Sequence, residues 1–126
     1  SAIAYTWKIK FNETSKTPAF YNVFPELNHN EMNGFEAKDL SKNFYFLFLK
    51  DSEDNPLIIK RMEVLEKLWR DKNLPVEVLE LKAENIFHKI FSSLVLADWT
   101  SYYLAKEYGV DPEQVPMVEE FKKLIK

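Results

Sequence analysis

Two short apolar runs lie between longer amphipathic segments of this chain, and they define the expected strands. Residues 44–49, FYFLFL, are almost wholly apolar and are bounded by polar residues. Such a run is typical of a strand buried on both faces, as in a parallel sheet covered by helices. Residues 75–81, PVEVLEL, alternate apolar and acidic positions, and this period of two predicts a strand nearer the sheet edge.

Apolar residues at three- and four-residue spacing predict helices over residues 2–13 and 57–72. The segment 15–18 breaks the first helix. Residues 50–56, KDSEDNP, are expected to be a loop between the first strand and the second helix. One face of the second helix is expected to comprise Ile58, Met62, Leu65, Leu68 and Trp69.

Residues 84–107 predict a long helix, and Gly109 lies just past its last turn, where a glycine commonly ends a helix. A final amphipathic helix is expected near the end of the chain, after the proline-containing segment DPEQVP. The apolar stripe of the long helix is expected to comprise Ile86, Phe87, Ile90, Phe91, Leu94 and Val95.

The order helix, strand, helix, strand, long helix, helix contains a βαβ arrangement, so we predict an α/β fold with a parallel sheet flanked by helices. Two strands make a small sheet, and we expect that a first strand of the domain is missing ahead of Ala2. With 126 residues, of which 46% are hydrophobic, the chain is long enough for one domain with its own core.

Composition excludes several classes of function. The net charge of −3 and the scattered basic residues give no electrostatic footprint for a nucleic acid. Two glycines are too few for a glycine-rich phosphate loop. No apolar run approaches the ~20 residues of a membrane helix, and no signal peptide is apparent. The absence of cysteine is compatible with a reducing cytoplasm, where we expect the protein to be located.

The stretch PELNHNEMNGF surrounds His29, one of only two histidines, with polar side chains. A histidine in a loop is more often structural than catalytic. Here, however, Asn28, Asn30 and Glu31 are placed to fix the tautomer and orientation of the ring, as a catalytic imidazole requires. Glu13 ends the first predicted helix, where a carboxylate is usually solvated but can also project into a cleft. If the two meet, they suit proton transfer next to a carbonyl.

Other residues carry weaker signals. Metal binding is not favoured, because His29 and His88 are far apart and no thiolate is present; we expect His88 to be structural. The cluster DWTSYY, residues 98–103, has two interpretations of equal weight. Its hydroxyl groups bond back to the helix, or they form a polar wall that faces a ligand.

Two stretches resemble a known family. FNETSKTPAFYNVFPELNHNEMNGF, residues 11–35, and LADWTSYYLAKEYGVDPEQVPMVEEFKKLIK, residues 96–126, resemble the C-terminal half of the bifunctional phosphoglucose/phosphomannose isomerases. Those enzymes belong to the sugar isomerase (SIS) domain superfamily. The resemblance covers nearly the whole chain and implies a SIS-type, flavodoxin-like fold.

By this resemblance, Glu13 matches the catalytic base that moves a proton between C2 and C1, and His29 matches the histidine that opens the sugar ring. The implied reaction interconverts glucose 6-phosphate or mannose 6-phosphate and fructose 6-phosphate through an enediol, with no metal or cofactor. Substrate-binding residues are expected near the final motif and beside the histidine, and the matching positions are Thr100, Ser101, Lys106 and Asn28.

The resemblance also implies a longer protein. Family members have two SIS domains in one chain, and the N-terminal domain carries the Ser/Thr loop that binds phosphate. We therefore expect residues 1–126 to be a C-terminal SIS domain that forms a homodimer and is weakly active or inactive alone. The alternatives are a non-catalytic sugar-phosphate-sensing SIS module and an oligomerisation scaffold, neither of which needs Glu13 paired with His29.

Overall fold

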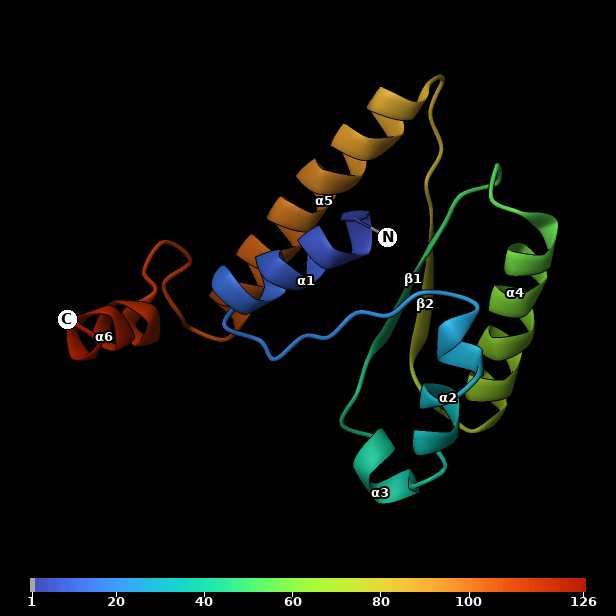
Figure 1. Cartoon of the computed structure of the whole chain (residues 1–126), viewed down its shortest axis with the longest axis horizontal. Coiled ribbons are helices and arrows are strands. Elements are labelled where there is room, and N and C mark those ends of the chain that lie inside the picture. The colour runs from blue at the N-terminus through green and yellow to red at the C-terminus, as the bar shows by residue number, and fades with distance from the viewer. Residues whose placement is uncertain (1) are drawn as a thin grey trace. The chain divides into compact units, whose positions relative to one another are not determined.

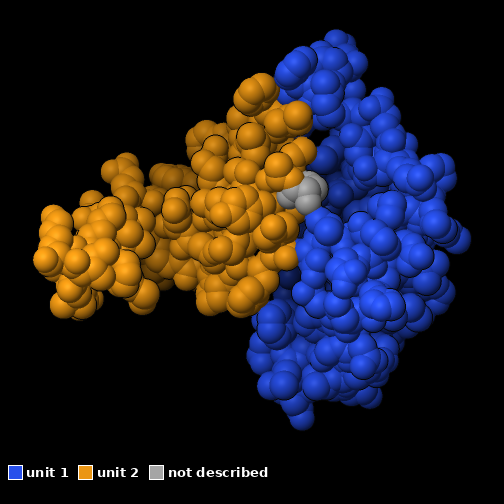
Figure 2. All heavy atoms as spheres, in the orientation of Figure 1, with its two compact units in different colours: residues 1, 22–89 blue, residues 2–21, 90–126 orange. Residues whose placement is uncertain are grey.

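A computed structural model describes residues 2–126 of the chain. These residues form two compact units (Figure 2). Unit 1 comprises residues 22–89, and unit 2 comprises residues 2–21 and 90–126. Each unit is described by itself.

The long elements follow the predicted order (Figure 1). Three short helical segments, η1, α2 and α3, lie between the first long helix and the first strand and were not predicted as separate elements. The bounds are α1 Ala2–Glu13, η1 Glu26–Asn28, α2 Glu31–Gly34, α3 Lys38–Ser41, β1 Phe46–Lys50, α4 Pro56–Asp71, β2 Val76–Glu80, α5 Ile86–Glu107 and α6 Pro116–Leu124.

In unit 1, β1 and β2 form a parallel two-stranded sheet in which Phe46 pairs with Val76 and Lys50 with Glu80. Helix α4 connects the strands, so the predicted α/β class and the parallel pairing are confirmed. The expectation that the first strand is buried on both faces is wrong. Only Phe48 is buried in β1, and its neighbours on the strand are half-buried.

The core of unit 1 forms between the sheet and one face of α4. Met62, Leu65 and Trp69 are buried on the predicted face, while Leu68 is 42% exposed. Their spacing of three and four residues places them on one side of the helix. Segments before the sheet pack against the same core, which places η1 and α2 beside it. The residues of these segments that do so are Phe24, Leu27, Met32 and Phe35.

In unit 2, α1 and α5 are joined by the Trp7 indole, which donates a 2.9 Å hydrogen bond to the Ser93 hydroxyl, and by a 2.5 Å ion pair between Lys10 and Asp98. The buried row of α5 in this unit consists of small residues four positions apart, which let another helix approach closely. These residues are Ser93, Ala97, Ser101 and Ala105.

The apolar stripe predicted for the long helix is not its buried face. The helix itself is confirmed, but the large side chains Phe87, Phe91 and Val95 are 55–69% exposed. Hydrophobic spacing alone predicts a helix without saying which apolar side is covered.

The predicted end of the long helix near Gly109 is confirmed. Gly109 has φ +65°, and the Val110 amide donates to the Ala105 carbonyl, which closes the end of α5.

Candidate functional site

His29 directly follows the short helix η1 as its C-cap, and only Asn30 separates it from α2. Its backbone amide donates a 2.8 Å hydrogen bond to the Glu26 carbonyl, which fixes the main chain at this position. Its side chain is exposed. Since the flanking apolar residues Leu27 and Met32 pack on the core of unit 1, the backbone is anchored while the imidazole faces outward.

The polar neighbours of His29 build the turn and do not orient the ring. The Asn30 side chain donates to the Glu26 carboxylate at 2.7 Å and accepts the Glu31 amide at 2.6 Å, so it caps α2. The Asn28 amide contacts the Met32 sulfur at 3.8 Å. No hydrogen bond to the His29 ring is present among residues 2–126. The prediction that Asn28, Asn30 and Glu31 fix this imidazole is therefore wrong.

Asn28 nonetheless has a hydrogen-bond acceptor that is not used. Its side-chain Oδ1 is buried and accepts no hydrogen bond from the described part of the chain. A buried acceptor without a partner is costly, and in native proteins it calls for an explanation.

Glu13 is the last residue of α1, and its side chain is exposed. The loop that follows is held by side-chain hydrogen bonds to the backbone. Asn12 donates to the Thr17 carbonyl at 2.9 Å, and the Ser15 hydroxyl donates to the Phe11 carbonyl at 2.7 Å. The Glu13 carboxylate therefore lies at the end of α1, next to a loop whose backbone conformation is fixed by hydrogen bonds.

Glu13 belongs to unit 2 and His29 to unit 1 (Figure 2). The surroundings of each residue are described, and their meeting in one site stays a prediction.

The remaining predicted residues lie on α5 in unit 2. Ser101 is fully buried and donates to the Asp98 carbonyl at 3.0 Å. Thr100 is exposed and donates to the Leu96 carbonyl at 2.7 Å. Both hydroxyl groups thus bond back to the helix, as in the first of the two interpretations of this cluster. The Lys106 ammonium lies 5.2 Å from the centre of the Tyr102 ring, in cation–π contact.

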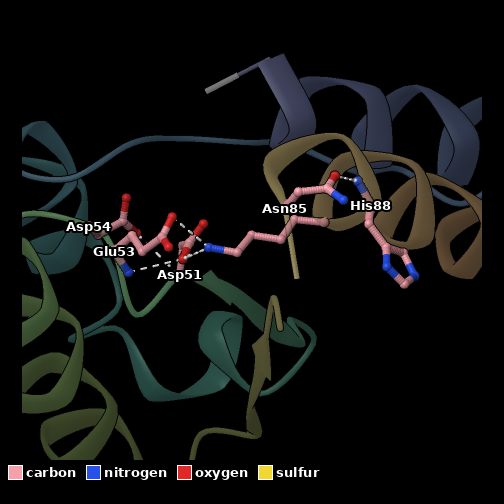
Figure 3. Close-up of polar contacts among 6 residues, drawn as sticks. Asp51, Glu53, Asp54, Asn85 and His88 are labelled. Atoms are coloured by element: carbon pink, nitrogen blue, oxygen red, sulfur yellow. Dashed lines mark hydrogen bonds and ion pairs between the residues drawn. The ribbon is translucent and has the colours of Figure 1, made fainter. Parts of the chain in front are cut away.

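His88 is not packed in the core. It lies in the first turn of α5 with an exposed side chain, and its backbone amide donates to the Asn85 side chain at 2.9 Å (Figure 3). The expected structural role of its imidazole is not supported by any packing.

A charged cluster at the end of β1 was missed by the sequence analysis, which assigned KDSEDNP only as a loop. Figure 3 shows the acidic side chains of this loop. The Lys89 ammonium lies 2.8 Å from a carboxylate oxygen of Asp51 and 2.8 Å from one of Glu53, and its side chain is 5% exposed. The available signal was a lysine among the apolar residues of a predicted helix, which does not identify its partner.

The protonation equilibria of this cluster reflect the ion pairs. The hydrogen bond from Lys89, followed by that from the Glu53 backbone amide, lowers the pKa of Asp51. The hydrogen bonds to Asp51 and Glu53 raise the pKa of Lys89. Both shifts favour the charged forms, so the cluster is an ion triad over the neutral range.

Two negative findings concern the described residues. Within residues 2–126, no three His, Cys, Asp or Glu side chains are grouped so as to hold a metal ion. None of the helices formed by these residues has the length and apolar character needed to cross a membrane.

Comparison with known proteins adds a family assignment. Residues 1–125 match the family model described as the bacterial phospho-glucose isomerase C-terminal SIS domain. The chain is 32% identical over 124 residues to a bifunctional phosphoglucose/phosphomannose isomerase of Aquifex aeolicus, and 35% identical over 124 residues to one of Thermoplasma volcanium. A protein of the same name from Caldicellulosiruptor bescii is 36% identical over 121 residues.

These alignments cover 95–98% of this chain but only 36–39% of each relative. The chain therefore spans less than two fifths of the length of the proteins that it matches.

Proposed function

Because the chain belongs to the family of bacterial phosphoglucose isomerase C-terminal SIS domains, we propose that it is the C-terminal domain of an aldose–ketose isomerase. The substrates are glucose 6-phosphate and mannose 6-phosphate, and the common product is fructose 6-phosphate. The observation that carries the proposal is the family match over residues 1–125, together with relatives that are all named bifunctional phosphoglucose/phosphomannose isomerases.

In the proposed mechanism, His29 transfers the proton that opens the sugar ring. Glu13 then removes a proton from the carbon next to the carbonyl and returns it to the neighbouring carbon through an enediol. A carboxylate and an imidazole suit these steps, since each can give and take a proton held within hydrogen-bond reach. The exposure of both side chains supports these roles.

Thr100, Ser101, Lys106 and Asn28 are assigned to substrate binding. Support differs among them. Asn28 offers an acceptor without a partner and stands next to His29 in the chain. Thr100 and Lys106 have exposed side chains. Ser101 is fully buried, so its hydroxyl would act by supporting the helix that presents Thr100.

The whole enzyme is proposed to contain an N-terminal SIS domain, which binds the phosphate group, and to work as a homodimer. The coverage of only 36–39% of each relative supports a longer polypeptide. Neither metal nor cofactor takes part in the proposed reaction.

The test is an isomerase assay on the full-length protein that carries this chain. We expect conversion of both aldose 6-phosphates to fructose 6-phosphate at rates within about tenfold of each other. Binding of fructose 6-phosphate without any turnover would instead identify a sensing module and would overturn the proposal.

A further inference from the structure

The turn that follows Glu13 is closed by backbone hydrogen bonds to the end of α1. The Thr14 amide donates to the Lys10 carbonyl at 2.9 Å, and the Thr17 amide donates to the Phe11 carbonyl at 3.1 Å. Both carbonyl groups belong to the last turn of α1, where the helix itself provides no partner for them. The chain therefore turns back on the helix directly after Glu13.

Lys16 lies in this turn with an unusual backbone conformation. Its φ is +54°, in the left-handed region that residues with a long side chain rarely adopt. Among residues 2–126, the only other non-glycine residue with a positive φ is Asn73, and asparagine tolerates this region better than lysine does. Such a conformation persists only where the surrounding structure enforces it.

The ammonium group of Lys16 makes contacts that enforce the conformation. It donates to the Thr14 carbonyl at 3.1 Å and to the Asp111 carbonyl at 2.5 Å, and its side chain is half-buried. Asp111 lies between α5 and α6, 95 residues away in the chain. Hydrogen bonds from a charged donor are stronger than those between neutral groups. One side chain thus connects the turn after Glu13 to the segment after α5.

The segment around Asp111 is itself held by local hydrogen bonds. The Val110 amide donates to the Ala105 carbonyl at 3.0 Å, next to Gly109 with φ +65°. The Asp111 carboxylate accepts the Glu113 amide at 2.8 Å. The Asp111 carbonyl is therefore a defined point beyond the end of α5, and Lys16 fastens the turn after α1 to it.

The direction of the Glu13 carboxylate depends on this arrangement. Glu13 is exposed at the end of α1, so the backbone from which it projects decides where the carboxylate can reach. A general base must lie within hydrogen-bond reach of the proton that it removes. A misplacement of about 1 Å caused by a change elsewhere can lower the rate by about 10²-fold.

We propose that Lys16 is a positioning residue for Glu13. Its ammonium group holds the turn after α1 in the conformation from which the Glu13 carboxylate reaches the substrate carbon. Lys16 acts through the backbone and does not contact the substrate. The inference rests on the proposed function for the role of Glu13, and on the hydrogen bonds to Thr14 and Asp111 for the role of Lys16.

The test separates the two steps of the proposed mechanism in the full-length protein. Exchange between the α and β anomers of glucose 6-phosphate requires ring opening, the step assigned to His29, but no proton transfer by Glu13. Conversion to fructose 6-phosphate requires both. For Lys16→Met we expect the kcat of conversion to fall at least about tenfold, with KM and enzyme-catalysed anomer exchange, followed by NMR, within about threefold of wild type.

Two further measurements examine the contact itself. Amide hydrogen exchange at residues 14–17 should become faster in Lys16→Met, because the ammonium no longer holds the turn. Lys16→Arg keeps a cationic donor and should restore the kcat of conversion to within about threefold of wild type.

The matched control is Lys10→Met. It removes a lysine of α1 that pairs with Asp98 on α5 but leaves the turn after Glu13 unchanged, so kcat should stay within about threefold of wild type. Equal losses of kcat in the two methionine variants would overturn the inference, and so would equal losses of conversion and anomer exchange in Lys16→Met.

Wild-type kcat in Lys16→Met would also overturn the inference. If this variant does not fold, Lys16→Gly removes the ammonium while it accommodates the positive φ, and wild-type kcat there has the same meaning. A wild-type protein without isomerase activity would refute the proposed function and with it the role of Lys16. An active wild type that Lys16→Met matches would refute only the inference.

Discussion

At the scale of single residues, the exposed imidazole of His29 is the most informative feature. Its polar neighbours in the sequence stabilise the turn instead of the ring, since the Asn30 side chain forms hydrogen bonds with Glu26 and Glu31. The ring therefore has no orienting partner among residues 2–126. In the proposed enzyme, the substrate or another part of the protein must supply that partner.

Replacement of His29 by glutamine in the full-length protein should lower kcat with glucose 6-phosphate by about 10²–10⁴-fold, the usual contribution of a general acid–base group. KM should change less than threefold, since the imidazole acts on the transition state. The control is His88→Gln, which changes another exposed histidine. Equal losses in both variants would contradict the catalytic role.

The ion triad predicts a specific dependence of stability on pH. The pKa of Asp51 is lowered from its ordinary value of 3.8, so its contribution to the free energy of unfolding is full above pH 3.8 and is lost as the pH falls through the folded-state pKa. The pKa of Lys89 is raised from 10.5, so its contribution is full below pH 10.5 and is lost as the pH rises further.

The difference in unfolding free energy between wild type and Lys89→Met should accordingly be constant from about pH 5 to pH 10 and should shrink outside that range. Urea unfolding of both proteins at a series of pH values measures it. A difference that already disappears near pH 7 would be incompatible with the ion triad.

At the scale of elements, most long helices and both strands follow from the spacing of apolar residues. Helix α1 has the predicted bounds, and α4 and β2 differ from prediction by a residue at each end. The short helices η1, α2 and α3 could not be predicted, because three or four residues do not complete a hydrophobic period.

The buried side of α5 also could not be predicted from the sequence, for a different reason. Its covered row in unit 2 consists of Ser and Ala, which carry little hydrophobic signal, while the large apolar residues are exposed. Glu13 and His29 were singled out from their local sequence, and the family resemblance then supplied their specific roles. No local pattern revealed the contact of Lys89 with Asp51, which are 38 residues apart.

The end of α5 allows a matched test of local structure. Gly109 has φ +65°, where a side chain is strained, and Gly34 has no positive φ. No atom would meet an added Cβ within 4 Å at either position. Gly109→Ala should therefore lower the free energy of unfolding by about 1 kcal/mol through backbone strain alone.

Gly34→Ala should leave stability the same or raise it slightly, because alanine restricts the unfolded chain. Chemical denaturation of the two variants beside the wild type gives both values. If the two substitutions had equal effects, the left-handed conformation at Gly109 would not be the cause.

At the scale of the whole molecule, the chain provides the proposed proton-transfer groups but no glycine-rich phosphate loop, since it has only two glycines. In the proposed enzyme the phosphate is bound by the N-terminal domain. Binding of a remote group supplies energy that positions the reacting carbon atoms.

The 126-residue chain alone should therefore convert glucose 6-phosphate or mannose 6-phosphate at least 10³-fold more slowly than the full-length protein. A coupled assay at equal molar concentrations, with circular dichroism to verify folding, makes the comparison. Turnover by the chain within tenfold of the full-length rate would show that no further phosphate site is needed.

The most direct test of the central claim, proton transfer by Glu13, follows deuterium in the product. Full-length wild type and Glu13→Gln are incubated with fructose 6-phosphate in D2O, with Glu77→Gln, a change at an exposed glutamate of β2, as control. NMR should show deuterium at C1 of fructose 6-phosphate for wild type and Glu77→Gln. Glu13→Gln should give none above the enzyme-free rate while it binds the sugar with a Kd within threefold of wild type. Incorporation by Glu13→Gln at the wild-type rate would contradict the account.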